Sequence, residues 1–235
     1  MFVENENTTR KNPFRKIYDN PDYKLCKKRK FPYIVDVELT NQCNLSCIFC
    51  GQQTMKRPKG YIDADLYKKI VNECYAYDTP IRLIRWGEPF LHPKILTFIE
   101  YTKELGIPLH ITNNGLALTK SHMESLVYNE VDSIIFSFQG ATKEQYEIMR
   151  NNNRYEELVG NIEKLIEIRA ENAKPFIHIS TTITDETKQE VDDFVNHWSH
   201  IVDSVGVGRT DLSRLDINRI KNKEVREKLT KVRDK

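Results

Sequence analysis

Strand-like and helical segments alternate along most of this sequence, and this alternation restricts the folds that the chain can adopt. Runs rich in β-branched and aromatic residues occupy six segments, at residues 34–40, 81–86, 108–112, 133–138, 176–183 and 203–207. Helical patterns lie between them, at residues 64–77, 93–105, 121–128, 142–149 with 155–173, and 186–200. Strands that alternate with helices form parallel sheets with right-handed crossovers. The sequence therefore predicts an α/β fold built on six parallel strands.

The length of the chain favours an open barrel over a closed one. A closed barrel of eight strand–helix units typically needs about 250 residues. This chain has 235 residues, and residues 1–30 precede the first predicted strand. We therefore expect a partial (β/α)6 barrel, that is, an incomplete TIM-like barrel of parallel strands. Functional sites in such folds form beyond the C-terminal ends of the strands.

The sequence divides into three regions by composition. We expect a basic N-terminal arm at residues 1–30, a core domain at residues 31–212 and a charged helical tail at residues 213–235. The predicted tail helix starts at Lys221 and follows the last predicted strand closely. A chain that ends in this way is either a single-domain protein or one truncated before an auxiliary domain.

The arm carries many Lys and Arg residues, set among Asn, Asp and Pro, and few aliphatic ones. We expect it to pack Phe14, Ile17 and Tyr18 against the outside of the core domain. The alternative is that its charges contact an acidic or phosphorylated substrate. The arm lacks the interleaved aromatic residues that favour nucleic-acid binding, so the sequence disfavours a nucleic-acid partner.

The net charge and the hydrophobic content argue against a polyanion-binding protein and against a membrane protein. The formal net charge is +2 and the hydrophobic content is 39%, which describes a globular protein that needs no polyanionic partner. No apolar run is long enough to span a bilayer, and the N-terminal residues do not resemble a signal peptide. The sequence therefore predicts a cytoplasmic protein without membrane contact.

Three of the five cysteines form a compact C-x3-C-x2-C pattern directly after the first predicted strand. They are Cys43, Cys47 and Cys50. Clustered cysteines in an intracellular chain favour metal binding over disulfides. Iron–sulfur clusters usually have four cysteine ligands, so three thiolates would leave one iron open to a substrate or cofactor. A structural zinc site or a chance cluster are the alternatives, although zinc usually needs a fourth Cys or His ligand.

Polar segments at the ends of later strands strengthen the iron–sulfur interpretation. The second strand ends in Trp86-Gly87-Glu88-Pro89, the third in Thr112-Asn113-Asn114-Gly115 and the fourth in Ser137-Phe138-Gln139-Gly140. Together with the cysteine pattern, these segments resemble the radical S-adenosylmethionine (radical SAM) enzymes, with Trp86 and Gln139 departing from the usual residues. Gln139 replaces the usual acid of that family, and this change is expected to alter what can be hydrogen-bonded next to the substrate. The resemblance extends over roughly residues 31–209.

The resemblance implies a cofactor set and a reaction. Cys43, Cys47 and Cys50 would bind a [4Fe-4S] cluster whose free iron chelates SAM. Reductive cleavage of SAM would give a 5′-deoxyadenosyl radical that abstracts hydrogen from a substrate C–H bond. Glycine lets a main chain approach a ligand closely, which would suit Gly87. The residues expected to contact SAM are Phe49, Gly87, Glu88, Ser137, Arg150, Thr182 and Val207.

The core most resembles the SPASM-type branch of these enzymes, but the sequence lacks that branch's C-terminal cysteine-rich extension. The expected partners are a small-molecule or peptide substrate, such as a sugar derivative, and an electron donor such as flavodoxin or ferredoxin. A non-catalytic iron–sulfur or zinc-binding redox or interaction module is the alternative function.

Other charged and cysteine residues have structural interpretations. Asp36 and Glu38 alternate with apolar residues on the first strand, and Arg82 or Arg85 would pair with them. Cys74 shares an apolar helical stripe with residues 66 and 70, which indicates a buried, inert thiol.

Overall fold

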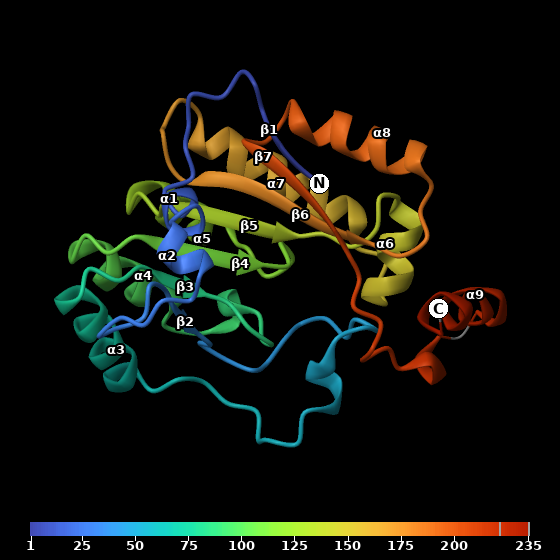
Figure 1. The fold of residues 1–235 in the computed structure, drawn as a ribbon, viewed down its shortest axis with the longest axis horizontal. Coiled ribbons are helices and arrows are strands. Elements are labelled where there is room, and N and C mark those ends of the chain that lie inside the picture. Colours follow the sequence, from blue (N-terminus) through green and yellow to red (C-terminus); the bar gives the residue numbers. More distant parts are fainter. Residues whose placement is uncertain (221, 235) are drawn as a thin grey trace.

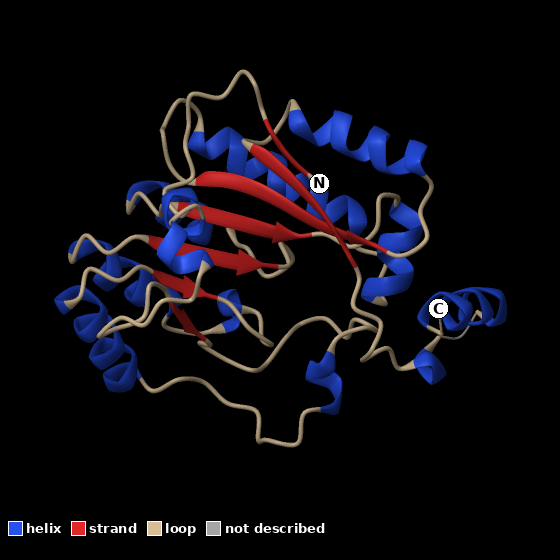
Figure 2. Cartoon of the chain, viewed as in Figure 1, coloured by secondary structure: helices blue, strands red, loops and turns tan. Residues whose placement is uncertain are grey.

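The computed structural model describes residues 1–220 and 222–234, and within them the strands form one open sheet (Figures 1 and 2). The sheet has the order β1-β7-β6-β5-β4-β3-β2, and β2 to β7 run parallel. The strands are β1 (Phe2–Glu4), β2 (Val35–Val37), β3 (Ile81–Leu83), β4 (Leu109–Asn113), β5 (Ser133–Ser137), β6 (Phe176–Ile183) and β7 (Ser204–Arg209). The predicted parallel α/β fold with an open, partial barrel is therefore confirmed.

One strand was not predicted. β1 belongs to the basic arm and pairs antiparallel with β7, where Phe2 lies opposite Gly206. Three residues are too few to show a strand pattern in the sequence. The arm therefore supplies one edge of the sheet, and β2 forms the other.

The helices predicted between the strands and in the tail are present, with ends that differ by a few residues, and the arm holds two short helices that were not predicted. The helices are α1 (Arg15–Tyr18), α2 (Pro21–Lys24), α3 (Ala64–Ala76), α4 (Ile95–Glu104), α5 (Lys120–Tyr128), α6 (Lys143–Arg150), α7 (Tyr155–Arg169), α8 (Lys188–Ser199) and α9 (Lys223–Arg233), with 3-10 turns η1 (Gly51–Thr54), η2 (Pro89–Leu91) and η3 (Ile217–Arg219). Thr187 caps α8 in a reciprocal pair with Glu190. Lys221, where the tail helix was predicted to start, lies outside the described residues. None of the described helices is long and apolar enough to cross a membrane.

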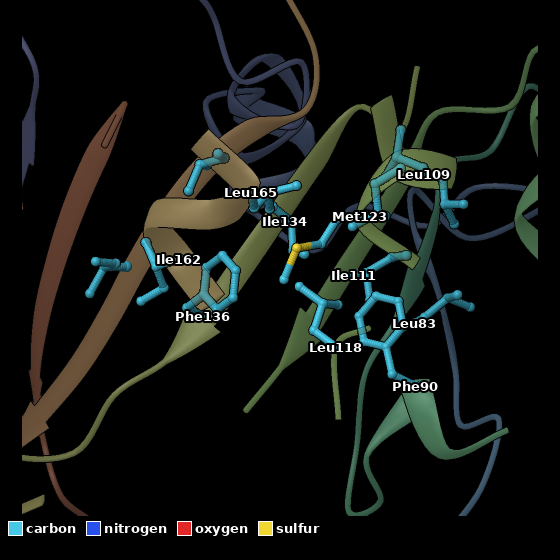
Figure 3. Close-up of a cluster of buried hydrophobic side chains, with 14 of the residues drawn as sticks. Leu83, Phe90, Leu109, Ile111, Leu118, Met123, Ile134, Phe136, Ile162 and Leu165 are labelled. Carbon is cyan, nitrogen blue, oxygen red and sulfur yellow. The ribbon is translucent and has the colours of Figure 1, made fainter. Parts of the chain in front are cut away.

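The main hydrophobic core lies between the sheet and the helices that connect its strands. Figure 3 shows Ile111, Ile134 and Phe136 of the sheet packed with Met123 of α5 and Ile162 of α7. On α3 the buried residues are Tyr67, Val71 and Cys74, whereas Leu66 is 50% exposed. The predicted burial of Cys74 is thus confirmed, but the predicted contribution of Leu66 to the same buried stripe is wrong.

The opposite face of the sheet, called the inner face here, is polar and is covered at its amino end by the arm. Figure 1 shows α1 and α2 in front of the sheet. Phe14 is fully buried with its ring 5.5 Å from that of His110, and the Tyr18 hydroxyl accepts a hydrogen bond from Arg82. The prediction that Phe14 and Tyr18 pack on the outside of the domain is wrong. They lie on the inner face, where Phe14 packs on the ring of His110 and Tyr18 contacts the guanidinium of Arg82.

The acidic residues of β2 find the partners that their burial requires. Arg82 binds Asp36 through two hydrogen bonds of 2.6 and 3.0 Å, and Arg85 lies 2.8 Å from the same carboxylate. Glu38 instead pairs with Arg57 and accepts a hydrogen bond from the backbone nitrogen of Trp86. The predicted ion pair is confirmed for Asp36, while Glu38 has a different partner from the one predicted.

Because histidines are buried on the inner face, we expect the protein to lose stability in acid. Burial lowers the pKa of His178 to about 4, below its unfolded value near 6.5. Between these values the unfolded chain binds more protons than the folded chain, so the free energy of unfolding falls as the pH is lowered, by on the order of 3 kcal/mol. We expect His178→Gln to weaken this pH dependence in urea titrations between about pH 7 and about pH 4. His200→Gln, at an exposed position, should leave it unchanged.

Candidate functional site

The three clustered cysteines lie on the loop that follows β2, at the C-terminal edge of the sheet. Cys47 is buried and Cys43 and Cys50 are half-buried. Cys50 also caps η1, since its sulfur accepts a hydrogen bond from the backbone nitrogen of Gln52 at 3.4 Å. Burial raises the pKa of Cys43 to about 11 and raises that of Cys50. Cys43 and Cys50 therefore stay neutral thiols until a cation binds and stabilises their thiolates.

Two side chains from other parts of the fold donate hydrogen bonds to the remaining thiols. Asn114, which follows β4, directs its amide nitrogen to Cys43 Sγ at 3.7 Å. Arg150, at the end of α6, directs Nη1 to Cys47 Sγ at 3.5 Å. Neither contact was predicted. The turn at residues 112–115 was visible in the sequence, but which thiol its amide would face was not.

The Gly87-Glu88 segment lies against the start of the cysteine loop. A Cβ atom on Gly87 would lie 1.9 Å from the carbonyl oxygen of Thr40, and Glu88 donates its backbone N–H to the Gln42 carbonyl at 2.8 Å. The sequence interpretation was that Gly87 allows close approach to a ligand. In the structure, the close approach that requires glycine is to the chain itself.

Glu88 is buried and binds the backbone with both carboxylate oxygens. One accepts from the nitrogen of Phe90 at 3.2 Å and the other from that of Asn114 at 2.8 Å. Burial raises the pKa of this carboxyl group to about 7. Glu88 thus connects the ends of β3 and β4, and it holds the residue that contacts Cys43.

The predicted contacts on β5 to β7 divide between two faces of the sheet. Ser137 pairs in register with Ser180, and Thr182 lies two residues further along the same inner face. Val207 belongs to the other face and packs against the main core, so its side chain does not reach this site. The sequence alone did not show which face of the sheet Val207 occupies, because residue 207 lies close to the end of its strand.

Gln139 was expected to influence what binds next to the substrate, and the structure places it elsewhere. Its side chain is fully buried. Its amide nitrogen donates to the Thr182 carbonyl and the Thr210 hydroxyl, and its oxygen accepts from the Thr182 hydroxyl. Gln139 therefore connects the ends of β5, β6 and β7, and the expectation of a role beside the substrate is wrong.

Two aromatic side chains, one on the cysteine loop and one beside it, each lie against the guanidinium of an arginine. The guanidinium of Arg150 lies 5.6 Å from the ring centre of Phe49, so two expected SAM contacts adjoin each other. Trp86 packs close to Gly51 of η1, and the guanidinium of Arg214 lies 4.8 Å from its ring centre. The large side chain at position 86 thus fills the space between the cysteine loop and the part of the chain that follows β7, called the C-terminal segment here.

The C-terminal segment covers one side of the cysteine loop. Ile48 packs with Leu212 and Leu215 in a second hydrophobic cluster, separate from the main core. Its backbone is held from both sides, because its nitrogen donates to the Met149 carbonyl and its carbonyl accepts from the Asp216 nitrogen. Figure 1 shows α9 beyond the C-terminal ends of the strands, beside this loop. The predicted tail therefore contacts the site rather than only solvent.

The thiols of the cysteine loop are of the kind that bind iron–sulfur clusters. Among the described residues, no three His, Cys, Asp or Glu side chains converge as ligands of one metal ion. A cubic cluster offers a separate iron to each cysteine, so its ligands need not meet at one point. Within the described part of the chain, the buried Nε of Arg150 also lacks a hydrogen-bond partner. The loop thus combines three thiols with an unsatisfied buried donor beside them.

Comparison with known proteins decides the family. The sequence profile of the Radical SAM superfamily matches residues 37–197, which include all three cysteines. The chain belongs to the radical SAM superfamily. This family uses a [4Fe-4S] cluster and SAM, so the predicted cofactor set is confirmed at the level of the family.

Relatives of this radical SAM chain include a cofactor-modifying protein, a heme synthase and a maturase. The cofactor-modifying protein for tungsten-containing aldehyde ferredoxin oxidoreductase of Pyrococcus furiosus is 26% identical over 68% of this chain and 46% of its own length. The AdoMet-dependent heme synthase of Methanosarcina barkeri is 28% identical over 68% of this chain and 45% of its own length. The mycofactocin maturase MftC of Mycobacterium tuberculosis is 24% identical over 69% and 41%. The chain thus spans about half the length of the curated relatives it matches.

Solved structures agree on the fold. Streptococcus suis SuiB bound to S-adenosylmethionine has a TM-score of 0.69 and 18% identity, covering 97% of this chain and 54% of its own. Methylornithine synthase has a TM-score of 0.63 and 12% identity, covering 85% of this chain and 61% of its own. These structures share the fold of this chain. The resemblance of the core to the SPASM-type branch, as the sequence predicted, is supported by the family model and by relatives such as MftC.

Proposed function

We propose that this chain is the catalytic core of a radical SAM enzyme, with the cluster held by Cys43, Cys47 and Cys50. The observation that carries the proposal is the position of these cysteines, on one loop at the C-terminal edge of the sheet. An N–H group lies within hydrogen-bonding distance of each thiol. When bound, the cluster and SAM would supply a 5′-deoxyadenosyl radical for hydrogen abstraction from a substrate C–H bond.

The residues around the loop would position and shield these cofactors rather than carry out the bond cleavage. Glu88 and Gly87 fix the backbone that leads into Cys43, and Arg150 fixes Cys47. Ser137 and Thr182 lie on the inner face. The Ser137 hydroxyl can donate a hydrogen bond to SAM, whereas the Thr182 hydroxyl already donates to Gln139 and can only accept one. Ile48 and the apolar residues of the C-terminal segment exclude water from one side of the loop.

We propose a peptide as the first substrate class to test, with a small molecule such as a sugar derivative as the second. MftC is a maturase, and SuiB has been solved with its precursor peptide SuiA. Both support a peptide substrate through resemblance of the core. An electron donor such as flavodoxin or ferredoxin and a cytoplasmic location complete the proposal.

Anaerobic reconstitution tests the proposed function directly. The protein is loaded with iron and sulfide, then incubated with dithionite and SAM, while iron and 5′-deoxyadenosine are quantified. We expect about four irons per chain and time-dependent formation of 5′-deoxyadenosine. Zinc in place of iron, or a protein that binds neither, would refute the proposal.

A further inference from the structure

Arg150 is the only cationic side chain that the described structure places in hydrogen-bond contact with a thiol of the cysteine loop. Its Nη1 lies 3.5 Å from Cys47 Sγ. The thiols of Cys43 and Cys50 instead face neutral donors, the amide of Asn114 and the backbone of Gln52. The three cysteines are therefore electrostatically unequal.

The guanidinium group is held in place by the fold. Its Nη2 donates to the carbonyl oxygens of Ser137, at 2.5 Å, and Phe138, at 3.2 Å. Arg150 is only 8% exposed, and its guanidinium lies over the ring of Phe49. A planar, rigid donor group in this setting loses little conformational freedom when it binds. The position of its positive charge relative to Cys47 is thus fixed by β5 and by the cysteine loop.

The resemblance to radical SAM enzymes suggested a different role, as a partner for the carboxylate of SAM. The contacts of Arg150 do not favour that role, because Nη1 and Nη2 are already directed at a cysteine and at two carbonyls. Within the described residues only Nε lacks a partner, and that atom is buried. A carboxylate that needs a two-pronged arginine contact would have to displace several of these bonds.

We propose that Arg150 is a positioning residue that holds Cys47 and sets the reduction potential of the cluster. This inference rests on the proposed function. Hydrogen bonds to the sulfurs, nearby charge and solvent exposure set the potentials of iron–sulfur clusters. A fixed positive charge stabilises the more negative, reduced state, and burial strengthens the effect because the local dielectric is low. Arg150 therefore makes the cluster easier to reduce.

The test is a redox titration of the reconstituted protein without SAM, followed by electron paramagnetic resonance. Arg150→Met keeps the length of the side chain and removes its charge and donors. We expect a midpoint potential more negative than that of the wild type, and a smaller fraction reduced by dithionite. Arg150→Lys, which keeps the charge, should fall between the two. Arg154→Met is the matched control, because Arg154 is partly exposed and pairs with Glu157 away from the thiols.

The measurement separates the possible roles of Arg150. An unchanged potential with weaker SAM binding would assign Arg150 to SAM and overturn the inference. If a variant binds no iron, circular dichroism compares its folding with that of the iron-free wild type. A folded variant that cannot hold iron supports the positioning role, whereas an unfolded one overturns it in favour of a general structural role. If the wild type itself binds no iron, the proposed function fails, and this result is distinct from a failure of the inference alone.

Discussion

Replacing Cys47 with alanine is expected to abolish cluster binding and SAM cleavage. Cys47 is the most buried of the three clustered cysteines, at 6% exposed, and its loop offers no fourth cysteine that could substitute. Loss of groups that merely surround a metal ligand typically costs 10–100-fold, so loss of a ligand should lower the rate of 5′-deoxyadenosine formation by more than about 100-fold. Iron per chain should fall sharply in the same reconstituted sample.

The other two cysteines of the chain provide matched controls for this prediction. Cys26 is exposed on the arm, and Cys74 is buried in α3, within the main core. Cys26→Ala and Cys74→Ala should retain the iron content of the wild type. Normal SAM cleavage by Cys47→Ala would contradict the assignment of the cluster to this loop.

Gly87→Ala is expected to have the second largest effect, although residue 87 is not a ligand. Its added methyl group would lie 1.9 Å from the carbonyl oxygen of Thr40 and 2.8 Å from that of Gln42. These are backbone atoms, so one of the two segments must move. Overpacking of this kind costs about 3 kcal/mol or more, which lowers the melting temperature of a chain of this size by roughly 6–12 °C.

The movement should also reach the cluster. Gln42 precedes Cys43 directly, and Glu88 donates its backbone N–H to the Gln42 carbonyl. A displaced turn would therefore shift the first thiol, and we expect reduced iron loading even in the fraction that folds. Gly160→Ala is the control, since outside the adjoining backbone of its own helix no described atom lies within 4 Å of a Cβ at that position. An iron content and melting temperature equal to the wild type in Gly87→Ala would refute this account.

Local patterns were sufficient to predict the framework of the fold. The alternation of strands and helices follows from side-chain periodicity, which a single sequence displays. The cysteine loop was equally visible, because its ligands are close together in the sequence. The arm was not placed correctly, since the burial of Phe14 depends on His110, almost a hundred residues away along the chain.

The contacts around the thiols could not be predicted from the sequence, because they also join residues that are far apart along the chain. Arg150 was identified through the resemblance to radical SAM enzymes, but its contact with Cys47 joins residues 103 positions apart. Gln139 was expected beside the substrate because it stands where radical SAM enzymes usually carry an acid. Its burial depends on hydrogen bonds to Thr182 and Thr210, which only the assembled sheet brings close.

The contacts that hold Ile48 in place affect how the protein takes up its metal. The backbone of this residue is fixed by Met149 on one side and Asp216 on the other, and its side chain is packed among apolar neighbours. In zinc fingers, by contrast, metal binding itself drives the chain to fold. Here the contacts that hold Ile48 are made by protein atoms alone, so they do not depend on bound iron. Chelation should then strip the metal and leave a folded apoprotein that can be refilled.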